Sequence, residues 1–555
     1  MINMETQIHM PTAIIGVDGT VIKFRDSYEC SDFSASLRYE NERITLSVTP
    51  RHPMSFDELS VVGYADVTEE DRVFMNGYQS WTDSREMTIN EKMTGIDHIP
   101  AAMVRKFNFD RYGDYALTRY SKNKGVFHGW TYAYVRRGDT FRLAGSVSER
   151  SGFTRIKLIA DKKRIKLSRE CQGAVYSEPF EAVDCALVTG SEEYVFSRWA
   201  EMTGAALTDG APEQLRGYTS WYRHYQDISE EKLRHDNEAL TASDMTADIF
   251  QIDDGYQTAV GDWLSIDKNK FPGGMKAAAD RIHEAGLKAG LWLAPFVCEK
   301  TSALMEQHPD WLMKDENGSP LGAGCNWSGS FALDLSNNEV RDYLRKVFDT
   351  VLNKWGFDLV KLDFLYAACI LPHNGKSRGQ LMCEAMDFLR ELCGKRLILG
   401  CGVPLGAAFG KVDYCRIGCD VGLDWNDSKL MQLTHRERVS TKNSILNSVF
   451  RRQLSKYFFR NDPDVFLLRS DNIKLSDRQR QSLAIINHLC GKVLFTSDDV
   501  SSYTERQKQL YERAKAFSGA KLLSADLTDG VLTLITRIGE KRLRIRIDTA
   551  DGKLI

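Results

Sequence analysis

The sequence lacks the features that mark several classes of protein. Lys and Arg number 73 and Asp and Glu 76, a formal net charge of −3 with no clustered basic arm, so nucleic acid and anionic membranes are poor partners. We find no signal-peptide pattern and no apolar run long enough to span a bilayer, and we expect a cytoplasmic location. The 12 cysteines include no C-x-x-C pair, which argues against a zinc site and predicts reduced, mostly buried thiols.

The length and composition predict several domains. With 555 residues the chain exceeds one typical hydrophobic core. Its 43% hydrophobic and 27% charged content is ordinary for a globular protein in water. Because repeats and low-complexity linkers are absent, the parts are expected to pack as one unit. We expect a multidomain β plus α/β protein divided into residues 1–205, 206–518 and 519–555.

Residues 1–205 have the pattern of short β-strands. Apolar and polar residues alternate, as in residues 44–48, and turns rich in Asp, Asn, Gly and Lys separate the segments, which predicts an N-terminal antiparallel β-sandwich. The segment Asn76–Trp81, an Asn-Gly turn followed by two aromatics, stands apart. Two interpretations stay open: a packed turn, or a loop that carries Trp81 into the cleft of a neighbouring domain.

From residue 206 the pattern changes to apolar strands alternating with helical segments, which predicts a central (β/α)8 TIM barrel. The expected strands cover residues 217–221, 248–256, 288–295, 358–364, 396–402, 413–420, 464–469 and 493–499. The expected helices cover residues 229–240, 275–285, 338–355, 380–392 and 447–457. An open doubly wound sheet would need a Gly-rich turn where the chain has Trp221, Tyr222 and Arg223. A hairpin of residues 531–535 and 543–547 predicts a small C-terminal antiparallel β domain.

Polar and aromatic residues collect at the ends of the expected barrel strands, where barrel chemistry takes place. They are Trp221, Asp253, Asp254, Trp292, Lys361, Asp363, Cys401, Arg416 and Asp420. The set contains no His, so we expect no transition-metal site, and a Mg²⁺ site would leave the aromatics unexplained. Carboxylates with aromatics suit a sugar, and we expect no cofactor. Plainer interpretations remain: a buried Lys361–Asp363 ion pair, and helix-cap roles for Asp253 and Asp254.

Two of these carboxylates have the placement that glycoside hydrolysis requires. Asp363 and Asp420 lie 420 − 363 = 57 positions apart, on the fourth and sixth strands, and are able to face one another across the barrel mouth. Lys361 is expected to keep Asp363 ionised. Apolar neighbours favour a protonated Asp420, whereas Arg416, four residues earlier, favours its ionised form. A loop carboxylate or helix cap is the alternative for Asp420.

Three motifs resemble signatures of the glycoside hydrolase family 36 α-galactosidases, in particular the shorter bacterial members. They are Phe250–Tyr256, Lys361–Phe364, and Arg416–Asp420 with Trp425, and the likeness extends from Asn76 to Asp499. The resemblance implies an N-terminal sandwich, a barrel and a C-terminal β domain. It also implies a retaining mechanism that acts on α-galactoside oligosaccharides.

Carried over by motif, the resemblance implies that Asp363 is the nucleophile and Asp420 the general acid/base. Among the substrate-binding residues that it implies, Asp253, Asp254 and Lys361 bind the sugar's 4-, 6- and 3-hydroxyls. The resemblance places Arg416, Cys401 and Gly402 near the 2-position. It implies that the walls of the pocket are formed by Trp81, Trp221, Tyr222 and Trp292. Two segments depart from the family pattern, Val403–Gly406 and Val421–Trp425. They leave the 2-position preference and the leaving-group site open.

Other functions remain open on the sequence alone. The same fold supports an α-galactosyl transglycosylase or an α-N-acetylgalactosaminidase. A sugar-binding protein that has lost catalysis is a further class, although such a protein commonly lacks one of the two carboxylates. A purely structural protein would give no reason for polar residues to collect at the strand ends. The oligomeric state stays open, a homo-oligomer included.

Overall fold

A computed structural model describes residues 9–429 and 431–555. The N-terminal part consists of two antiparallel sheets. The first has the order β2-β1-β6-β13-β12-β9, with β1 (His9–Val17), β2 (Thr20–Phe24), β6 (Glu58–Tyr64), β9 (Val126–Trp130), β12 (Thr154–Ile159) and β13 (Arg164–Arg169). The second has the order β3-β4-β5-β14-β11-β10-β7-β8, with β3 (Ser27–Glu29), β4 (Phe33–Glu40), β5 (Arg43–Pro50), β7 (Arg72–Met75), β8 (Glu86–Met87), β10 (Tyr132–Arg137), β11 (Thr140–Ser146) and β14 (Phe180–Gly190).

Both sheets contribute to one hydrophobic core. In β5, Ile44, Leu46 and Val48 are fully buried while their polar neighbours are partly exposed, because successive side chains of a strand point to opposite faces. Buried residues of the other sheet, such as Ile15 and Leu59, belong to the same cluster. The alternation seen in the sequence is therefore the pattern of a sheet with one face buried.

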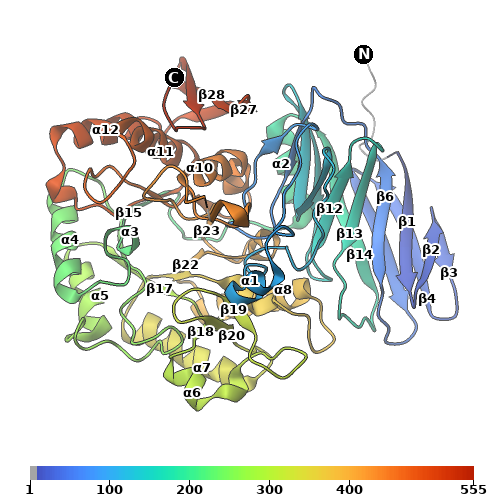
Figure 1. Ribbon diagram of the computed structural model, residues 1–555, viewed down its shortest axis with the longest axis horizontal. Coiled ribbons are helices and arrows are strands. Elements are labelled where there is room, and N and C mark those ends of the chain that lie inside the picture. Colours follow the sequence, from blue (N-terminus) through green and yellow to red (C-terminus); the bar gives the residue numbers. More distant parts are fainter. Residues whose placement is uncertain (1–8, 430) are drawn as a thin grey trace.

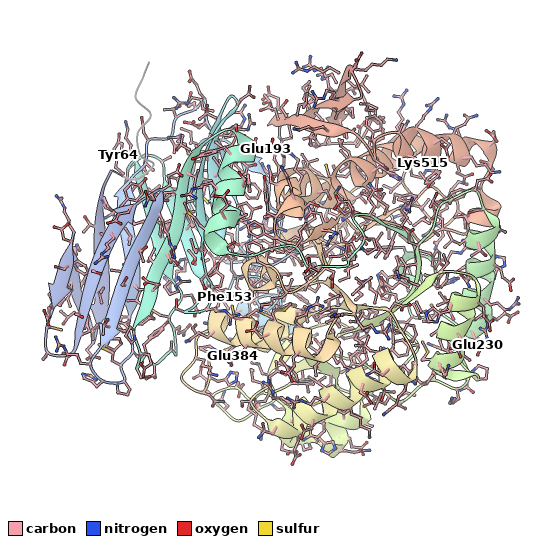
Figure 2. The ribbon with its side chains drawn as sticks, turned by 180° about the vertical axis from the view of Figure 1, so that it is seen from behind. Tyr64, Phe153, Glu193, Glu230, Glu384 and Lys515 are labelled. Atoms are coloured by element: carbon pink, nitrogen blue, oxygen red, sulfur yellow. The ribbon has the colours of Figure 1, made fainter. Side chains whose placement is uncertain are left out.

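Helix α2 (Glu192–Thr203) joins this part to the rest of the molecule. Figure 2 shows the helix, which carries Glu193, between the N-terminal strands and the parallel sheet. The indole of Trp199 donates a hydrogen bond to the Ser146 carbonyl at 2.8 Å, and the ring packs against Phe409 and Phe458. A fully buried tryptophan thus fixes the two parts against one another.

The central part is a parallel sheet that curls back on itself. Its order is β24-β23-β22-β21-β17-β16-β15-β26-β25, with β15 (Leu215–Thr219), β16 (Ile249–Ile252), β17 (Lys288–Leu293), β21 (Leu359–Leu362), β22 (Leu397–Gly400), β23 (Tyr414–Arg416), β24 (Arg460–Asp462), β25 (Val465–Phe466) and β26 (Val493–Thr496). The two end strands, β24 and β25, are separated only by Pro463 and Asp464. Such a sheet is consistent with a multidomain protein of TIM-barrel type.

Helices alternate with these strands. They include α4 (Glu230–Ala242), α5 (Gly274–Glu284), α7 (Asn338–Asp349), α8 (Arg378–Cys393), α10 (Thr441–Phe450), α11 (Asp477–Cys490) and α12 (Glu505–Lys515). Their starts follow capping rules, since Ser377 and Gln380 form a capping box at α8. One face of each is apolar: Val340, Leu344 and Val347 of α7 are fully buried.

Several expected boundaries were wrong. In place of the strand expected over 464–469 there are two short strands, β24 and β25, with Pro463, which has no N–H to donate to a ladder, between them. The helix expected over 447–457 runs from Thr441 to Phe450. The helix expected over 338–355 ends at Asp349 and continues as a wider π turn to Lys354. Trp221 begins the short helix α3 (Trp221–His224) instead of ending a strand.

The C-terminal strands β27 (Lys521–Thr528), β28 (Val531–Ile538) and β29 (Lys541–Asp548) form a three-stranded antiparallel sheet, the expected hairpin with one strand added. Leu532, Leu534 and Ile547 of this sheet share the core of the parallel sheet. The indole of Trp425 donates to the Thr549 carbonyl at 3.0 Å. In the described part of the chain, no helix combines the length and apolarity needed to cross a bilayer.

Residues 76–125, here called the arm, lie between β7 and β9; β8 stays at the edge of the second sheet, and other parts of the arm reach the parallel sheet. Figure 1 shows helix α1 (Ala101–Phe107) of the arm beside the elements of the parallel part. Ser80 donates its backbone N–H to the Val403 carbonyl at 2.9 Å, and Ser84 donates its own to Asn447 Oδ1 at 2.6 Å. Of the two interpretations of Asn76–Trp81, the structure therefore agrees with a loop that enters a neighbouring cleft.

Candidate active site

A cavity of about 420 Å³ lies at the carboxyl ends of the parallel strands. Most of the residues expected from the sequence line it: Trp81, Trp221, Asp253, Asp254, Trp292, Lys361, Asp363 and Asp420. The strand ends bring these side chains together because parallel strands of a curled sheet all end on one face. A volume of this size is typical of small-molecule sites.

Lys361 does not pair with Asp363 as expected. Its Nζ lies 2.8 Å from Asp253 Oδ2, and both side chains are more than nine-tenths buried. Burial alone would lower the pKa of Lys361, but the charges of Asp253 and Asp363 raise it, so the lysine stays cationic. Lys361 therefore acts on Asp363 through the field of its charge, while its direct ion pair is with Asp253, which follows β16 on the far side of β17.

The carboxylate of Asp363 accepts hydrogen bonds from two other donors. The Trp292 indole donates to Oδ2 at 3.1 Å, and the Phe364 backbone N–H donates to Oδ1 at 2.9 Å. Phe364 adopts the left-handed conformation, with φ of +54°, which is unusual for an aromatic residue and typical of functional loops. Two N–H donors therefore fix the orientation of this carboxyl group in the cavity.

Asp254 is surrounded by side-chain N–H donors. Gln257 donates to Oδ1 at 2.6 Å, and Gln226 and Trp327 donate to Oδ2 at 2.9 and 2.8 Å. Burial raises the pKa of Asp254, and these donors oppose the rise. The next helix of the chain is α5, which begins only at Gly274, so the helix-cap interpretation of Asp253 and Asp254 was wrong.

Asp420 has a different environment from Asp363. Its side chain is 40% exposed in the cavity, and Oδ1 lies 2.9 Å from Arg416 Nη1. Burial by the surrounding protein raises the pKa of Asp420 although Arg416 and Lys361 lower it, and the charges of Asp363 and Asp253 add to the rise. In the balance that the sequence left open, burial thus outweighs Arg416, and the pKa of Asp420 lies above its usual value.

Four expected site residues lie behind the lining of the cavity. Cys401 accepts a hydrogen bond from the Trp81 indole at 3.2 Å, and burial raises the pKa of its thiol well above the usual value. Gly402 has φ of +59°, and a Cβ there would come within 2.8 Å of the Trp81 ring. Tyr222 donates its hydroxyl to Asp464, and Arg416 holds Asp420. These residues position the lining and do not form it.

Other lining residues were missed by the sequence analysis. They come mainly from the arm and from two loops: Phe109, Tyr112, Gln226, Cys325, Asn326, Trp327, Phe364, Cys419, Met431, Thr434, Glu437, Arg438 and Val439. Glu437 accepts a hydrogen bond from Thr82 of the arm at 2.7 Å, and burial raises its pKa to about 8. No local pattern marks such residues, because they reach the cavity through long-range contacts. Among residues 9–429 and 431–555, no group of His, Cys, Asp or Glu has the arrangement of a metal site.

Comparison with known proteins agrees with this geometry. Residues 217–377, which contain Asp253, Lys361 and Asp363, match the melibiase family. The resemblance to the family 36 α-galactosidases is confirmed. The family match covers the first four parallel strands and the helices between them. Asp420 lies beyond the matched residues.

Individual relatives extend the comparison. The chain is 32% identical over 151 residues to α-galactosidase Mel36A of Lactobacillus acidophilus, 26% of this chain and 20% of that protein. It is 35% identical over 138 residues to an A type blood α-D-galactosamine galactosaminidase of Flavonifractor plautii, 23% of this chain and 13% of that protein. The matched stretches span a fifth or less of these curated relatives.

The structure comparison covers more of the chain. The α-galactosidase TtGalA of Thermus thermophilus, solved with p-nitrophenyl α-D-galactopyranoside, superposes with a TM-score of 0.70 at 26% identity. That superposition covers 96% of this chain and 98% of the other. The likeness to a family 36 enzyme therefore extends across both antiparallel parts as well as the parallel sheet.

Proposed function

We propose that this protein is a retaining, exo-acting α-galactosidase that removes terminal α-linked galactose from oligosaccharides of the raffinose and melibiose type. The observation that carries the proposal is the contrast between two carboxyl groups that line one cavity. Asp363 accepts two N–H donors, whereas burial raises the pKa of Asp420. An ionised nucleophile facing a protonated acid is the pair that retaining glycosidases use.

The mechanism follows from these two roles. Asp363 attacks the anomeric carbon while Asp420 gives its proton to the departing glycosidic oxygen, and a galactosyl ester forms on Asp363. Asp420, now ionised, then takes a proton from a water molecule, which releases galactose with its α configuration retained. The charges of Arg416 and Lys361 stabilise Asp420 during the interval in which it is ionised.

Sugar recognition uses the remaining lining residues. Lys361 and Asp253 form one charged pair at the cavity floor, and Asp254 forms a second polar group with its three donors. Charged groups of this kind bind sugar hydroxyls, while the faces of Trp221 and Trp292 cover C–H surfaces. A buried carboxylate that faces axial O4 would lose its partner with glucose, which costs about 1–3 kcal/mol or more.

The same proposal includes the finer fold. If β24 and β25 are two halves of one strand, the parallel sheet has eight strands and closes as a (β/α)8 barrel. The two N-terminal sheets with their common core would be a β-sandwich of residues 1–205. Residues 206–518 would be the catalytic barrel and residues 519–555 the C-terminal β domain.

The direct test is turnover of p-nitrophenyl α-galactoside with the product followed by proton NMR. We expect α-galactose to appear first and to equilibrate slowly with the β anomer, and we expect the α-glucoside to react at least about 100-fold more slowly. Initial release of β-galactose would exclude the retaining mechanism. Lack of turnover on any α-galactoside would exclude the activity.

A second substrate belongs in the same assay because one relative is a galactosaminidase. The aryl α-glycoside of N-acetylgalactosamine differs from the galactoside only at the 2-position, near which the family resemblance places Cys401 and Gly402. Preference for the acetamido sugar would instead support the α-N-acetylgalactosaminidase alternative. Addition of sucrose as an acceptor separates hydrolysis from transglycosylation, since a transglycosylase would convert galactosyl donors into raffinose-type products.

A further inference from the structure

Behind Asp420, one guanidinium group is shared by three carboxylates. Arg416 places Nη1 at 2.9 Å from Asp420, Nε at 2.8 Å from Asp462 and Nη2 at 2.9 Å from Asp464. The side chains of Arg416, Asp462 and Asp464 are 4%, 3% and 1% exposed. One buried positive charge therefore faces three acids, and full ionisation of all three would leave two negative charges without a counterion.

Asp464 occupies this position through an irregular backbone. It lies between β24 and β25, directly after Pro463, with φ of +77°. Its Oδ2 accepts the backbone N–H of Val421 at 2.8 Å and the hydroxyl of Tyr222, while its own N–H donates to Asp462 Oδ1 at 2.8 Å. The break in the seventh strand thus directs a carboxylate at the arginine that holds Asp420.

Electrostatics link the protonation of these groups. The charged and titratable groups that face Asp464 are Arg416, Asp420, Asp462, Tyr222 and Cys419. Burial and the two acids raise the pKa of Asp464 to about 7, although Arg416 lowers it. Those that face Asp420 are the charged groups Arg416, Lys361, Asp363, Asp253 and Asp464, the thiols of Cys401 and Cys419, and the hydroxyls of Tyr222 and Tyr225. Asp464 therefore loses its proton and becomes negatively charged as the pH rises through neutrality. In the same pH range Asp420 must still hold its proton if it is to act as a general acid.

We propose that Asp464 is a positioning residue for the galactosidase reaction: by taking part of the charge of Arg416, it keeps Asp420 protonated between turnovers. The inference rests on the proposed function, because it acts through the general acid of that reaction. An ionised Asp464 competes with Asp420 for the guanidinium and repels a second negative charge nearby. Both effects disfavour ionised Asp420 and extend its activity as an acid toward higher pH.

The substitution Asp464→Asn tests this role. Asparagine has nearly the same shape, tolerates a positive φ and retains an oxygen for the Val421 N–H and the Tyr222 hydroxyl. With the charge removed, Arg416 interacts more strongly with Asp420 and lowers its pKa. We expect the alkaline limb of the kcat/KM profile for p-nitrophenyl α-galactoside to move to lower pH by about one unit, with activity on the acid side largely kept.

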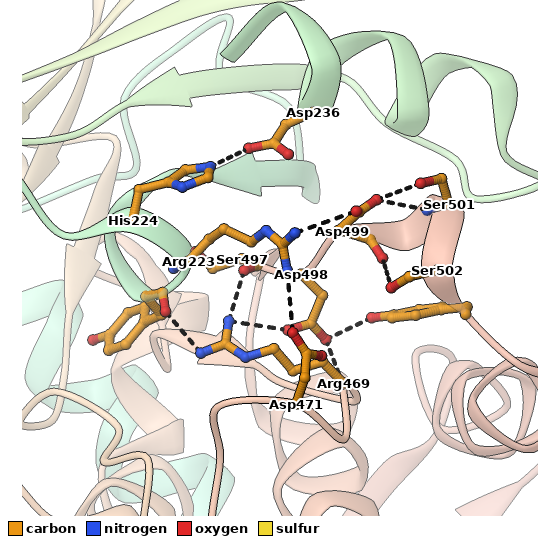
Figure 3. Close-up of polar contacts among 12 residues, drawn as sticks. Arg223, His224, Asp236, Arg469, Asp471, Ser497, Asp498, Asp499, Ser501 and Ser502 are labelled. Atoms are coloured by element: carbon orange, nitrogen blue, oxygen red, sulfur yellow. Dashed lines mark hydrogen bonds and ion pairs between the residues drawn. The ribbon is translucent and has the colours of Figure 1, made fainter. Parts of the chain in front are cut away.

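A matched control exists at the next strand end. Asp498, directly after β26, is fully buried and accepts the backbone N–H groups of Leu468 and Arg469 and the hydroxyl of Tyr503. Figure 3 shows its contact with Arg469, which belongs to a polar cluster with Arg223 and Asp499 and touches Tyr222 only at the backbone carbonyl. Asp498→Asn removes a comparable buried charge without contact to Arg416. We expect the alkaline limb of this variant to stay at the wild-type pH.

The outcomes separate the inference from the proposed function. If the wild-type protein hydrolyses no α-galactoside, the proposed function fails. If the wild-type protein is active but Asp464→Asn leaves the alkaline limb of the pH profile in place, the positioning role is wrong. The role is also wrong if Asp498→Asn moves the limb as far as Asp464→Asn does. If Asp464→Asn fails to fold, the same pH profile measured on Tyr222→Phe tests the positioning role. Loss of that hydroxyl raises the pKa of Asp464, so a smaller shift in the same direction supports the role and no shift contradicts it.

Discussion

The cavity has two walls of different origin and chemistry. The barrel wall consists of residues at strand ends: Asp253, Asp254, Trp292, Lys361 and Asp363. The arm wall consists of residues from segment 76–125: Trp81, Phe109 and Tyr112. The first is rich in buried charges fixed by short strands, and the second is aromatic and held by long-range hydrogen bonds. We infer that the barrel wall determines the chemistry and the identity of the sugar that is bound. The arm wall, we infer, determines the affinity for the rest of the substrate.

The largest effect is expected at Asp363 of the barrel wall, which we propose as the nucleophile. Asp363→Asn retains the hydrogen-bond acceptor for Trp292 but loses the negative charge that attacks carbon. We expect kcat for an aryl α-galactoside to fall by about 10⁴-fold or more. Galactose binding, measured by calorimetry, should change little. Retained turnover would remove Asp363 from this role and with it the distinction between the two walls.

A smaller loss is expected from Asp253→Asn. The substitution leaves Lys361 without its buried partner, and unpaired buried charges cost about 2–5 kcal/mol. We expect kcat/KM to fall by at least about 100-fold for every α-galactoside, whatever the leaving group. Asp236→Asn is the control: Asp236 is also buried and bonded, to Tyr218 and His224, outside the cavity lining. Equal losses in the two variants would show that only stability had changed.

The arm wall is expected to affect binding more than chemistry. In Trp81→Phe the indole N–H that reaches Cys401 is lost, but an aromatic ring remains against Phe364. We expect KM to rise about tenfold with kcat nearly unchanged, and the rise should differ between raffinose and the aryl galactoside. The matched variant Trp327→Phe removes a donor to Asp254 and should weaken all galactosides alike. If both variants behaved alike, the division into two walls would be wrong.

The smallest effect concerns Glu437, where the arm meets a barrel loop. Its pKa is raised to about 8 in the folded protein, above the usual value near 4.3. The folded state therefore binds more protons than the unfolded state between these values, and the stability that Glu437 contributes is lost as pH rises toward 8. We expect the Tm of Glu437→Gln to fall less than that of the wild-type protein between pH 5 and 8. The expected difference between the two proteins is about 2 °C. Parallel melting curves for both proteins across that range would contradict it.

The sequence predicted the barrel wall better than the arm wall for physical reasons. Strand periodicity and the convergence of strand ends placed Asp253 and Asp363 in one cavity. Side chains two positions apart face the same side of a strand, so a Lys361–Asp363 ion pair was one interpretation of the sequence. The lysine instead reaches Asp253 on another strand, and strand order is not written in local sequence. A signal for the break between β24 and β25 was present in Pro463.

The arm illustrates what local patterns leave out. The aromatic loop Asn76–Trp81 could be recognised as unusual, but its destination depends on tertiary contacts with Val403 and Asn447. Nothing in the local sequence marked Tyr112 or Glu437 as cavity residues. The pKa of Asp420 likewise depends on tertiary structure, because burial raises it and Arg416 lowers it. How strongly burial acts depends on how much water the folded protein excludes from this side chain.

The central claim is that Asp363 bonds covalently to galactose while Asp420 holds the proton opposite. Trapping with a slow fluorinated galactosyl substrate that has a good leaving group, followed by mass spectrometry of the digested protein, tests this claim most directly. We predict one added fluorogalactosyl group per chain, on the peptide that contains Asp363. A label on any other residue, or an active protein that accumulates no label, would contradict the account.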